Sequence, residues 1–294
     1  MTRVIHIAHS VACVALLAGI AAGLLLLAYP GSVTGLYLLR GGVADVCRVS
    51  DAAAGMQKHL AIRERGTALT AASIVERRSG EYELLRTPHG SWWMPRGNHA
   101  PVAEMLGQQL HQIYGDVRAG SIVLDCGAHI GLFAREALSR GAARVVAIEP
   151  AAENLECLRR NLAPELLAGR VVIYPKGVWE TETVLRFHKV EGNSGGDSFV
   201  IDNGPGGSVE VPVTTIDKLV SELRLDRVDF IKMDIKGAER EALRGATAVM
   251  RRWKPALAVA AEHRPDDDVV LPRIIREAWA GYTAVCGSCY ARNG

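Results

Sequence analysis

The sequence has few aromatic residues and almost no excess charge of either sign. Of its 294 residues 5% are aromatic, and 34 Lys and Arg residues against 32 Asp and Glu residues leave a net charge of +2. A dedicated nucleic-acid binder normally carries a basic stripe or aromatic platforms on which bases stack. We therefore expect no nucleic-acid partner. The hydrophobic fraction of 49% also excludes an intrinsically disordered chain.

The six cysteines indicate neither a disulfide framework nor a metal site. Cys13 lies in an apolar N-terminal run, and Cys126 and Cys157 lie in predicted core elements. Cys286 and Cys289 form a C-x-x-C pair, but one such pair without a second is insufficient evidence for a zinc site. We interpret this pair as incidental and predict no metal ligands.

Charge is missing altogether from Val4 to Leu39, and 21 of the 26 residues from Val4 to Tyr29 are apolar. A helix of that length measures about 39 Å, enough to cross a hydrocarbon layer of about 30 Å. We therefore predict a membrane anchor at residues 1–30. A cleaved signal peptide is the alternative, but the core Val11–Ala28 is longer than the usual ~7–15 residues and no A-x-A site follows it.

The rest of the chain divides into a linker and one large domain. Residues 31–80, helix-compatible over Ala44–Arg78, are predicted to form a juxtamembrane stalk, and residues 81–294 the main domain. Arg3 alone precedes the apolar run, whereas several basic residues follow it: Arg40, Arg48, Lys58, Arg63 and Arg65. The positive-inside rule then predicts a single-pass membrane protein whose main domain is cytoplasmic.

The main domain begins with a small β-structure. Tyr82–Leu85 and Ser91–Met94 predict two short strands around a turn, and Val102–Tyr114 predicts an amphipathic helix. Trp92 and Trp93 in the second strand are candidates for stacking on a substrate, but we interpret them as packing residues.

From Ser121 onward, apolar strands alternate with helices. The predicted strands are Ile122–Asp125, Val145–Ile148, Val171–Tyr174, Val228–Met233 and Ala256–Ala261. The predicted helices are Gly131–Arg140, Ala151–Leu162, Thr215–Leu225, Glu239–Trp253 and Val269–Trp279. Continuous apolar strands covered by helices predict an α/β fold with a doubly wound, Rossmann-like parallel sheet. Val184–His188 and Val209–Val213 predict a β-hairpin inserted near the carboxyl edge of that sheet.

The first predicted strand runs into a glycine-spaced turn that precedes a helix. The turn reads D-x-G-x-x-x-G from Asp125 to Gly131, so it lacks the third glycine of the dinucleotide-binding pattern G-x-G-x-x-G. Glycines allow close approach of the backbone to a ligand, and a helix N-terminus offers unpaired N–H groups. Asp125 suits a cationic ligand such as S-adenosylmethionine. Glu149, which ends the next strand, is placed to reach ribose hydroxyls.

The second chemical signal lies at the end of the strand Val228–Met233. Asp234 follows this strand directly, at the sheet edge where doubly wound folds bind ligands. Asp234 and Glu239 also have structural interpretations, because carboxylates cap helices and favour helix N-termini.

Taken together, these segments resemble the FkbM-type S-adenosylmethionine-dependent methyltransferases, from about Tyr82 to Tyr290. The matching motifs are Asp125–Gly131, Ala147–Pro150 with Asn154 and Asn161, Thr215–Asp217, Phe230–Glu239 and His263–Asp266. The resemblance implies a class I methyltransferase sheet and methyl transfer from S-adenosylmethionine to a hydroxyl of a sugar, glycolipid or secondary metabolite. It implies cofactor binding by Asp125, Gly127, Ala128, His129, Gly131, Glu149 and Pro150.

The chain departs from the family pattern at three places. The family usually has Asn where His129 stands and Glu where Lys236 stands, so charge is reversed at the second position. The chain also stops at Gly294, soon after Tyr282–Val285, and we expect the last antiparallel strand to be short or absent.

An alkyl hydroxyl is about as weak an acid as water, with a pKa of ~15.7, so a base assists its methylation. We predict Asp234 as the base or acceptor-orienting group, His263 as the second candidate, and Glu239 as a third catalytic residue. His188 on the inserted hairpin is a weaker candidate. We interpret Asp266–Asp268 as the cap of a helix.

The leading hypothesis is a membrane-anchored O-methyltransferase with a small-molecule or glycan acceptor, for which the membrane position suggests a lipid-linked molecule. Two alternatives stay open. One is a catalytically degenerate methyltransferase fold that serves as a membrane module, favoured by Lys236 and the short C-terminus. The other is a nicotinamide-dependent oxidoreductase, disfavoured by the missing glycine of the turn.

Overall fold

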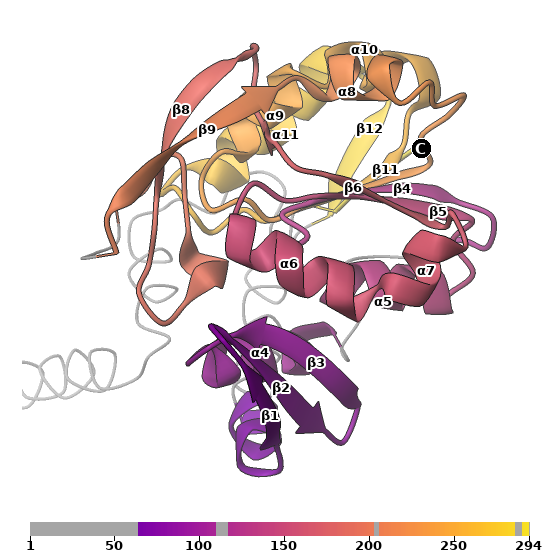
Figure 1. Ribbon diagram of the computed structural model, residues 1–294. Coiled ribbons are helices and arrows are strands. Elements are labelled where there is room, and N and C mark those ends of the chain that lie inside the picture. Colours follow the sequence, from indigo (N-terminus) through magenta and orange to yellow (C-terminus); the bar gives the residue numbers. More distant parts are fainter. Residues whose placement is uncertain (1–63, 110–116, 203–205, 286–289, 294) are drawn as a thin grey trace, which may run out of the picture. The chain divides into compact units, whose positions relative to one another are not determined.

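The computed structural model describes residues 64–109, 117–202, 206–285 and 290–293, and the remainder is drawn in grey (Figure 1). The anchor predicted at residues 1–30 and residues 31–63 of the predicted linker lie outside these ranges. Within the described ranges, no helix combines the length and apolar character needed to cross a membrane. All described residues belong to one of two units of the chain, His59–Gly294.

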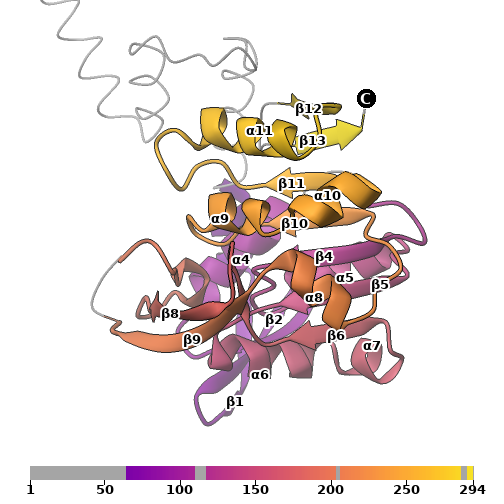
Figure 2. The same ribbon diagram turned by 90° about the horizontal axis from the view of Figure 1, so that it is seen from above.

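A seven-stranded sheet forms the centre of this unit, in the order β12-β13-β11-β10-β4-β5-β6 (Figure 2). The five central strands are parallel, as predicted: β4 (Ile122–Cys126), β5 (Arg144–Ile148), β6 (Val171–Tyr174), β10 (Phe230–Met233) and β11 (Ala256–Val259). At one edge, β12 (Tyr282–Val285) and β13 (Tyr290–Asn293) add antiparallel strands of four residues each. The last strand is therefore present and short.

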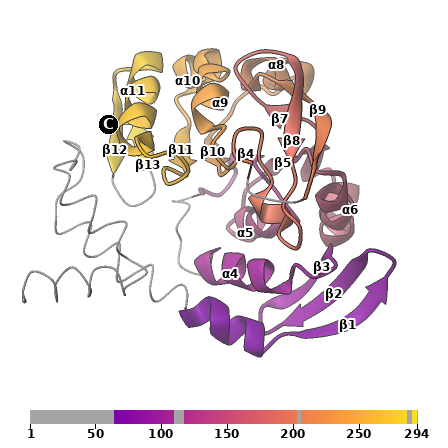
Figure 3. The same ribbon diagram turned by 90° about the vertical axis from the view of Figure 1, so that its left-hand side faces the viewer.

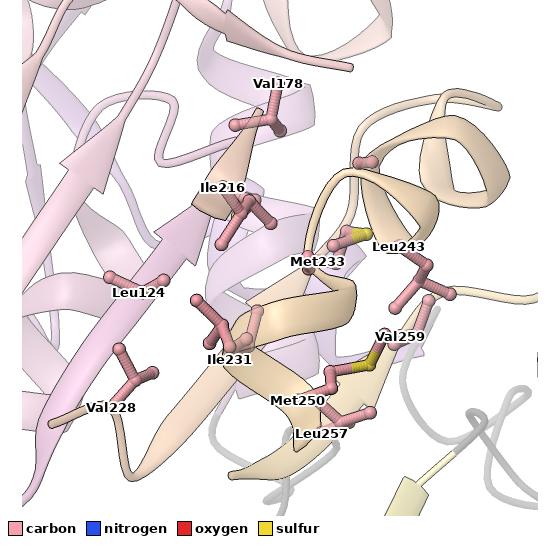
Figure 4. Packing of buried hydrophobic residues seen from close by; sticks show 14 of the residues in the cluster. Leu124, Val178, Ile216, Val228, Ile231, Met233, Leu243, Met250, Leu257 and Val259 are labelled. Atoms are coloured by element: carbon pink, nitrogen blue, oxygen red, sulfur yellow. The ribbon is translucent and has the colours of Figure 1, made fainter. Parts of the chain in front are cut away.

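Helices cover both faces of the sheet because alternate strand residues point to opposite sides (Figure 1). One face is covered by α5 (Leu132–Ser139), α6 (Ala152–Asn161) and α7 (Ala163–Leu167). The other is covered by α8 (Ile216–Glu222), α9 (Glu239–Arg244), α10 (Thr247–Trp253) and α11 (Asp267–Ala278). On this second face Ile231 and Met233 of β10 pack with Ile216 and Leu243 from the helices (Figure 4).

The prediction of one helix over Glu239–Trp253 is wrong in one respect, because α9 ends at Arg244 and α10 begins at Thr247. Gly245 lies at the break. A Cβ atom there would come within 2.1 Å of the carbonyl oxygen of Trp179, so the backbones approach too closely for any other residue. The break therefore reflects a tertiary contact that helical periodicity does not reveal.

The N-terminal elements form a separate layer beside α5 and α6 (Figures 1 and 3). The layer contains β1 (Ile74–Ser79), β2 (Tyr82–Thr87), β3 (Gly90–Pro95) and α4 (His99–Gln109). The two predicted strands are confirmed, whereas β1 lies in the segment predicted as helical stalk. The sequence of β1 has no apolar alternation, and its side chains are mostly exposed. The strand is defined by its pairing with β2.

Packing residues join this layer to the main sheet. Trp92 is 3% exposed in the apolar cluster of the layer, and the Arg135 guanidinium lies 3.7 Å from its ring centre. The Asn161 side chain bonds both backbone groups of Trp93, at 2.7 Å and 2.8 Å. The interpretation of the paired tryptophans as packing residues is thus confirmed.

The predicted inserted hairpin is confirmed as β8 (Thr183–His188) and β9 (Ser208–Thr214), which form a small sheet with β7 (Gly177–Val178) (Figure 3). The connection from β8 to β9 contains the 3-10 helix η1 (Ser194–Gly196). We call residues 189–199 the strap, because this segment passes over the carboxyl ends of the parallel strands, where it contacts His129 and Lys236.

Candidate functional site

Two adjoining cavities lie at the carboxyl ends of β4, β5 and β10. The first, of about 60 Å³, is lined by residues that include Ile148, Glu149, Pro150, Val178 and Phe187. The second, of about 250 Å³, lies between α4, α5 and the strap. The cavities share five lining residues, which are Gly127, His129, Gly195, Asp234 and Lys236. These five form the wall at which the two cavities meet.

The two glycines of the turn serve packing more than ligand approach. Gly127 has φ +80°, and a Cβ atom there would lie 2.2 Å from the carbonyl oxygen of Asp234. Gly131 has φ +94°, and a Cβ atom there would lie 2.8 Å from Leu158. The sequence interpretation of these glycines as room for a ligand is therefore incomplete. The room that they leave is filled by Asp234, directly after β10, and by Leu158 of α6.

The N–H groups of the turn are also occupied. Those of Gly127 and Ala128 both donate to the carbonyl oxygen of Ile148, each at 3.0 Å. The N–H of His129 donates to a carboxylate oxygen of Glu149 at 2.8 Å. These three N–H groups thus fix the turn against β5 and the residue that follows it.

Asp125 lies behind the cavity wall. Its side chain is 0% exposed, and the ammonium of Lys232 lies 3.2 Å from its Oδ1 atom. Lys232 also donates to the carbonyl oxygen of Gly127 at 2.8 Å. Burial raises the pKa of Asp125, and the charge of Lys232 opposes this increase. Among the described residues, Lys232 lines the second cavity and Asp125 lines neither.

Lys232 is not among the site residues predicted from the sequence. The signal was a lysine in the middle of the apolar strand Phe230–Met233, since a charged residue is almost never fully buried unless it is paired. The parallel register places Lys232 directly opposite Asp125.

Glu149 lines the first cavity, and three hydrogen bonds hold its carboxylate in place. Its carboxylate accepts the N–H groups of His129 at 2.8 Å and Ala151 at 2.9 Å, and the amide of Asn154 at 3.3 Å. Burial raises the pKa of Glu149 to about 7, although these hydrogen bonds favour the ionised form. Glu149 therefore presents to the first cavity a buried carboxylate whose charge changes near pH 7.

His129 lines both cavities and is neutral. Its Nε2 atom lies 2.9 Å from the Ser194 hydroxyl, which in turn donates to Oδ1 of Asn98 at 3.1 Å. Because the hydroxyl has one hydrogen, Nε2–H must donate to it, which leaves Nδ1 as an acceptor. Among the described residues, Nδ1 has no hydrogen-bond partner. Burial and the charges of Lys232 and Lys236 lower the pKa of His129 to about 3.

The three predicted catalytic residues come together. Asp234 follows β10, His263 follows β11 and Glu239 begins α9. Nδ1 of His263 lies 3.0 Å from Glu239, and its Nε2 lies 3.6 Å from Asp234. Glu239 is 0% exposed and also accepts the N–H groups of Ile235 at 2.8 Å and Gly237 at 2.9 Å. Glu239 therefore fixes the loop and orients His263 through three hydrogen bonds to its buried carboxylate.

Lys236 completes this cluster. Its ammonium lies 2.7 Å from Oδ1 of Asp234 and 3.4 Å from Nε2 of His263. Burial would raise the pKa of Asp234, but the charges of Lys236 and Lys232 outweigh burial and hold it below its ordinary value. Burial lowers the pKa of His263, but its hydrogen bond with Glu239 produces a net increase.

Residues 125–282, more than half of the chain, match the sequence model of the methyltransferase FkbM domain. The chain belongs to the FkbM methyltransferase family. It is also 28% identical over 160 residues to the AMB antimetabolite synthetase AmbE of Pseudomonas aeruginosa, which covers 42% of this chain and 8% of AmbE. The chain thus spans a small fraction of the length of that curated relative.

Solved structures with similarity to this chain include two methyltransferases. The methyltransferase FkbM from Methylobacillus flagellatus KT is 19% identical, covers 82% of this chain and 58% of its own, and has a TM-score of 0.44. The precorrin-6y C5,15-methyltransferase from Geobacter metallireducens GS-15 is 13% identical, covers 62% of this chain and 73% of its own, and has a TM-score of 0.37.

The two residues at which this member of the FkbM methyltransferase family departs from the expected pattern share a backbone conformation. His129 and Lys236 both have φ of +51°. Asn, Asp and His are enriched in this left-handed region, so an Asn-to-His change at position 129 keeps a residue type that tolerates it. Lys236 has no such preference and is held there by its neighbours.

The remaining sequence candidates lie elsewhere. His188 lies 3.6 Å from Asp202, and among the described residues it lines neither cavity. Asp266 is the N-cap residue of α11, and Asp267 and Asp268 lie in its first turn, as interpreted, but the Asp266 side chain makes no capping hydrogen bond. Asp266 and Asp267 instead bind Arg240, at 2.5 Å and 2.6 Å.

The strap supplies residues that the sequence analysis did not identify. The Asn98 side chain accepts a hydrogen bond from the backbone N–H of Ser194 at 2.8 Å. The Asn154 side chain donates one to the carbonyl oxygen of Ser194 at 3.4 Å. The Ser198 hydroxyl donates to the carbonyl oxygen of Lys236 at 2.6 Å. Strap residues line both cavities. The available signal was the glycine-rich stretch that interrupts the predicted hairpin.

Proposed function

We propose that this chain is an S-adenosylmethionine-dependent O-methyltransferase that acts on a hydroxyl of a sugar, glycolipid or secondary metabolite. The observation that carries the proposal is the shared wall of the two cavities. Glu149 lines the first cavity, and Asp234 and Lys236 of the shared wall contact His263, which itself lines neither cavity among the described residues. A nucleoside site and a proton-accepting site are thus adjacent, as methyl transfer from this cofactor requires.

The residues of the first cavity suit the nucleoside part of the cofactor. The Glu149 carboxylate is placed to accept hydrogen bonds from ribose hydroxyls. Ile148, Val178 and Phe187 offer apolar surface to the adenine ring. The free Nδ1 lone pair of His129 accepts a hydrogen bond from a hydroxyl or ammonium group. When bound, the cofactor supplies a methyl group already activated by its sulfonium, so the chain needs mainly to place and desolvate the reactants.

On the acceptor side His263 is the best-placed base. Since the Lys236 ammonium only donates, Nε2 of His263 accepts and Nδ1–H donates to Glu239. Nε2 therefore carries the lone pair that takes the hydroxyl proton. Asp234 stays ionised because its pKa is lowered, which makes it a hydrogen-bond acceptor that orients the hydroxyl. Glu239 is a positioning residue.

The proposal includes where the protein is located in the cell. The charge-free run Val4–Leu39 supports a single-pass membrane anchor, and the basic residues that follow support a cytoplasmic catalytic domain. A lipid-linked acceptor would suit this position.

The test uses the full chain in detergent. Isothermal titration should show binding of S-adenosylmethionine, and labelled methyl donor should transfer label to lipid-linked sugar extracts as a base-stable ether. Tight binding of a nicotinamide cofactor alone would overturn the proposal. Cofactor binding without transfer to any acceptor in a glycan panel would instead favour the degenerate membrane module.

A further inference from the structure

The cluster at the acceptor side resembles a divalent-cation site in its donor atoms. Asp234, Glu239 and His263 each offer one ligand atom, and these atoms lie within 4.8 Å of one another. Carboxylate oxygens and imidazole nitrogens together are typical ligands of divalent metals. Glu239 is already used by two backbone N–H groups and by His263. Because the Glu239 side chain is 0% exposed, the more accessible ligands for a cation are Asp234 and His263, through Oδ1 and Nε2.

The Lys236 ammonium already lies beside both of these atoms, at 2.7 Å and 3.4 Å. A divalent cation and an ammonium cannot both bind between the same two atoms, because like charges at such distances repel strongly in a partly buried site. The chain's own cation therefore occupies the place that the donor set would offer to a metal.

The position of Lys236 is fixed by its backbone. Its φ is +51°, and the next residue, Gly237, has φ +99°. Glu239 accepts the N–H groups on either side of Lys236, and Ser198 of the strap donates to its carbonyl oxygen at 2.6 Å. Strained backbone of this kind persists only where surrounding contacts hold it, and it clusters at functional sites. These contacts direct the side chain back toward Asp234 and His263.

We propose that Lys236 is the built-in cation of this site: its ammonium excludes a divalent metal from Asp234 and His263 and donates its third N–H to the acceptor oxygen. The second half rests on the proposed function, whereas the exclusion of a metal does not. In the transfer, the acceptor hydroxyl displaces the Lys236 N–H from the single lone pair on Nε2 of His263, its proton passes to Nε2, and its oxygen forms the new C–O bond. The electron pair of the broken C–S bond stays on sulfur, and Lys236 keeps its three protons.

The first arm of the test measures Mn²⁺ binding to the full chain by titration calorimetry and electron paramagnetic resonance. We expect the Lys236→Glu variant to bind Mn²⁺ at least about tenfold more tightly than the wild type, because a repelling charge becomes a ligand. Adding Asp234→Asn should abolish this binding. Lys218→Glu is the matched control, since it makes the same charge change at an exposed lysine. Wild-type binding as tight as that of Lys236→Glu, and lost on Asp234→Asn, would overturn the proposal.

The second arm measures turnover. A chelator should leave wild-type kcat unchanged, and Lys236→Met should lower kcat by about 10²-fold, as loss of a single oxyanion donor does. Abolition of wild-type turnover by the chelator, or full kcat in Lys236→Met, would refute the role of the ammonium. If the wild type methylates no acceptor, the proposed function fails, and the Mn²⁺ titration still decides whether Lys236 excludes the metal.

Discussion

The nucleoside side and the acceptor side of the site stabilise their buried carboxylates in different ways. On the nucleoside side, Glu149 is stabilised by two backbone N–H groups and an amide, which are fixed by the turn and by α6. On the acceptor side, Asp234, Lys236 and His263 stabilise one another through side chains. Backbone donors persist when neighbouring side chains change, whereas a charge network depends on every member. Substitutions should therefore change affinity on the first side and turnover on the second.

The largest effect is expected on the acceptor side. His263→Ala removes the proposed base and should lower kcat by about 10²–10⁴-fold, the usual contribution of a general base. The dissociation constant of S-adenosylmethionine should stay close to the wild-type value, because His263 lines neither cavity among the described residues. Single-turnover kinetics and titration calorimetry separate the two quantities. Full turnover in both His263→Ala and Asp234→Asn would refute the assignment of the base.

A substitution in the shared wall should lower the stability of the fold. Gly127→Ala places a Cβ atom 2.2 Å from the Asp234 carbonyl oxygen at φ +80°. We expect the free energy of unfolding to fall by about 2–4 kcal/mol, from backbone strain plus this clash. Gly120→Ala is a matched control, because Gly120 has the same φ and a Cβ atom there would meet nothing within 4 Å. Equal losses in urea unfolding for the two variants would contradict the close packing of the turn against β10.

On the nucleoside side, Glu149→Gln should weaken cofactor binding by about 10–100-fold, the range expected when hydrogen bonds to a charged group are lost. At saturating cofactor, kcat should change little. His263→Ala supplies the opposite pattern and serves as the comparison. A Glu149→Gln variant with normal affinity and reduced kcat would reverse the division of roles between the two sides.

The smallest predicted effect is a pH dependence of cofactor affinity. The pKa of Glu149 is raised to about 7 by burial, so the ionised acceptor is lost as pH falls through 7. Affinity should then decrease by up to about tenfold per pH unit below that value and level off above it. Calorimetry from pH 5.5 to 8.5 measures the effect, and Glu149→Gln should show none of it. A flat wild-type profile would mean that cofactor affinity does not depend on the ionisation of Glu149, and would contradict this prediction.

Much of the fold could be predicted because it depends on local pattern. The continuous apolar strands and the intervening helices gave the parallel sheet, and alternation gave the hairpin of β8 and β9. The strand β1 was missed because only its pairing with β2 defines it. The break between α9 and α10 was missed because it follows from the approach of Gly245 to Trp179.

The sequence by itself determined which residues reach the carboxyl edge of the sheet, since strand ends follow from local hydrophobicity. It therefore identified Glu149, Asp234 and His263. Only the tertiary structure decided their partners. The register between β10 and β4 places Lys232 opposite Asp125, and the loop after β11 brings His263 to Glu239. These partners lie far apart in the chain, and neither composition nor periodicity specifies which side chains meet when strands and loops are brought together.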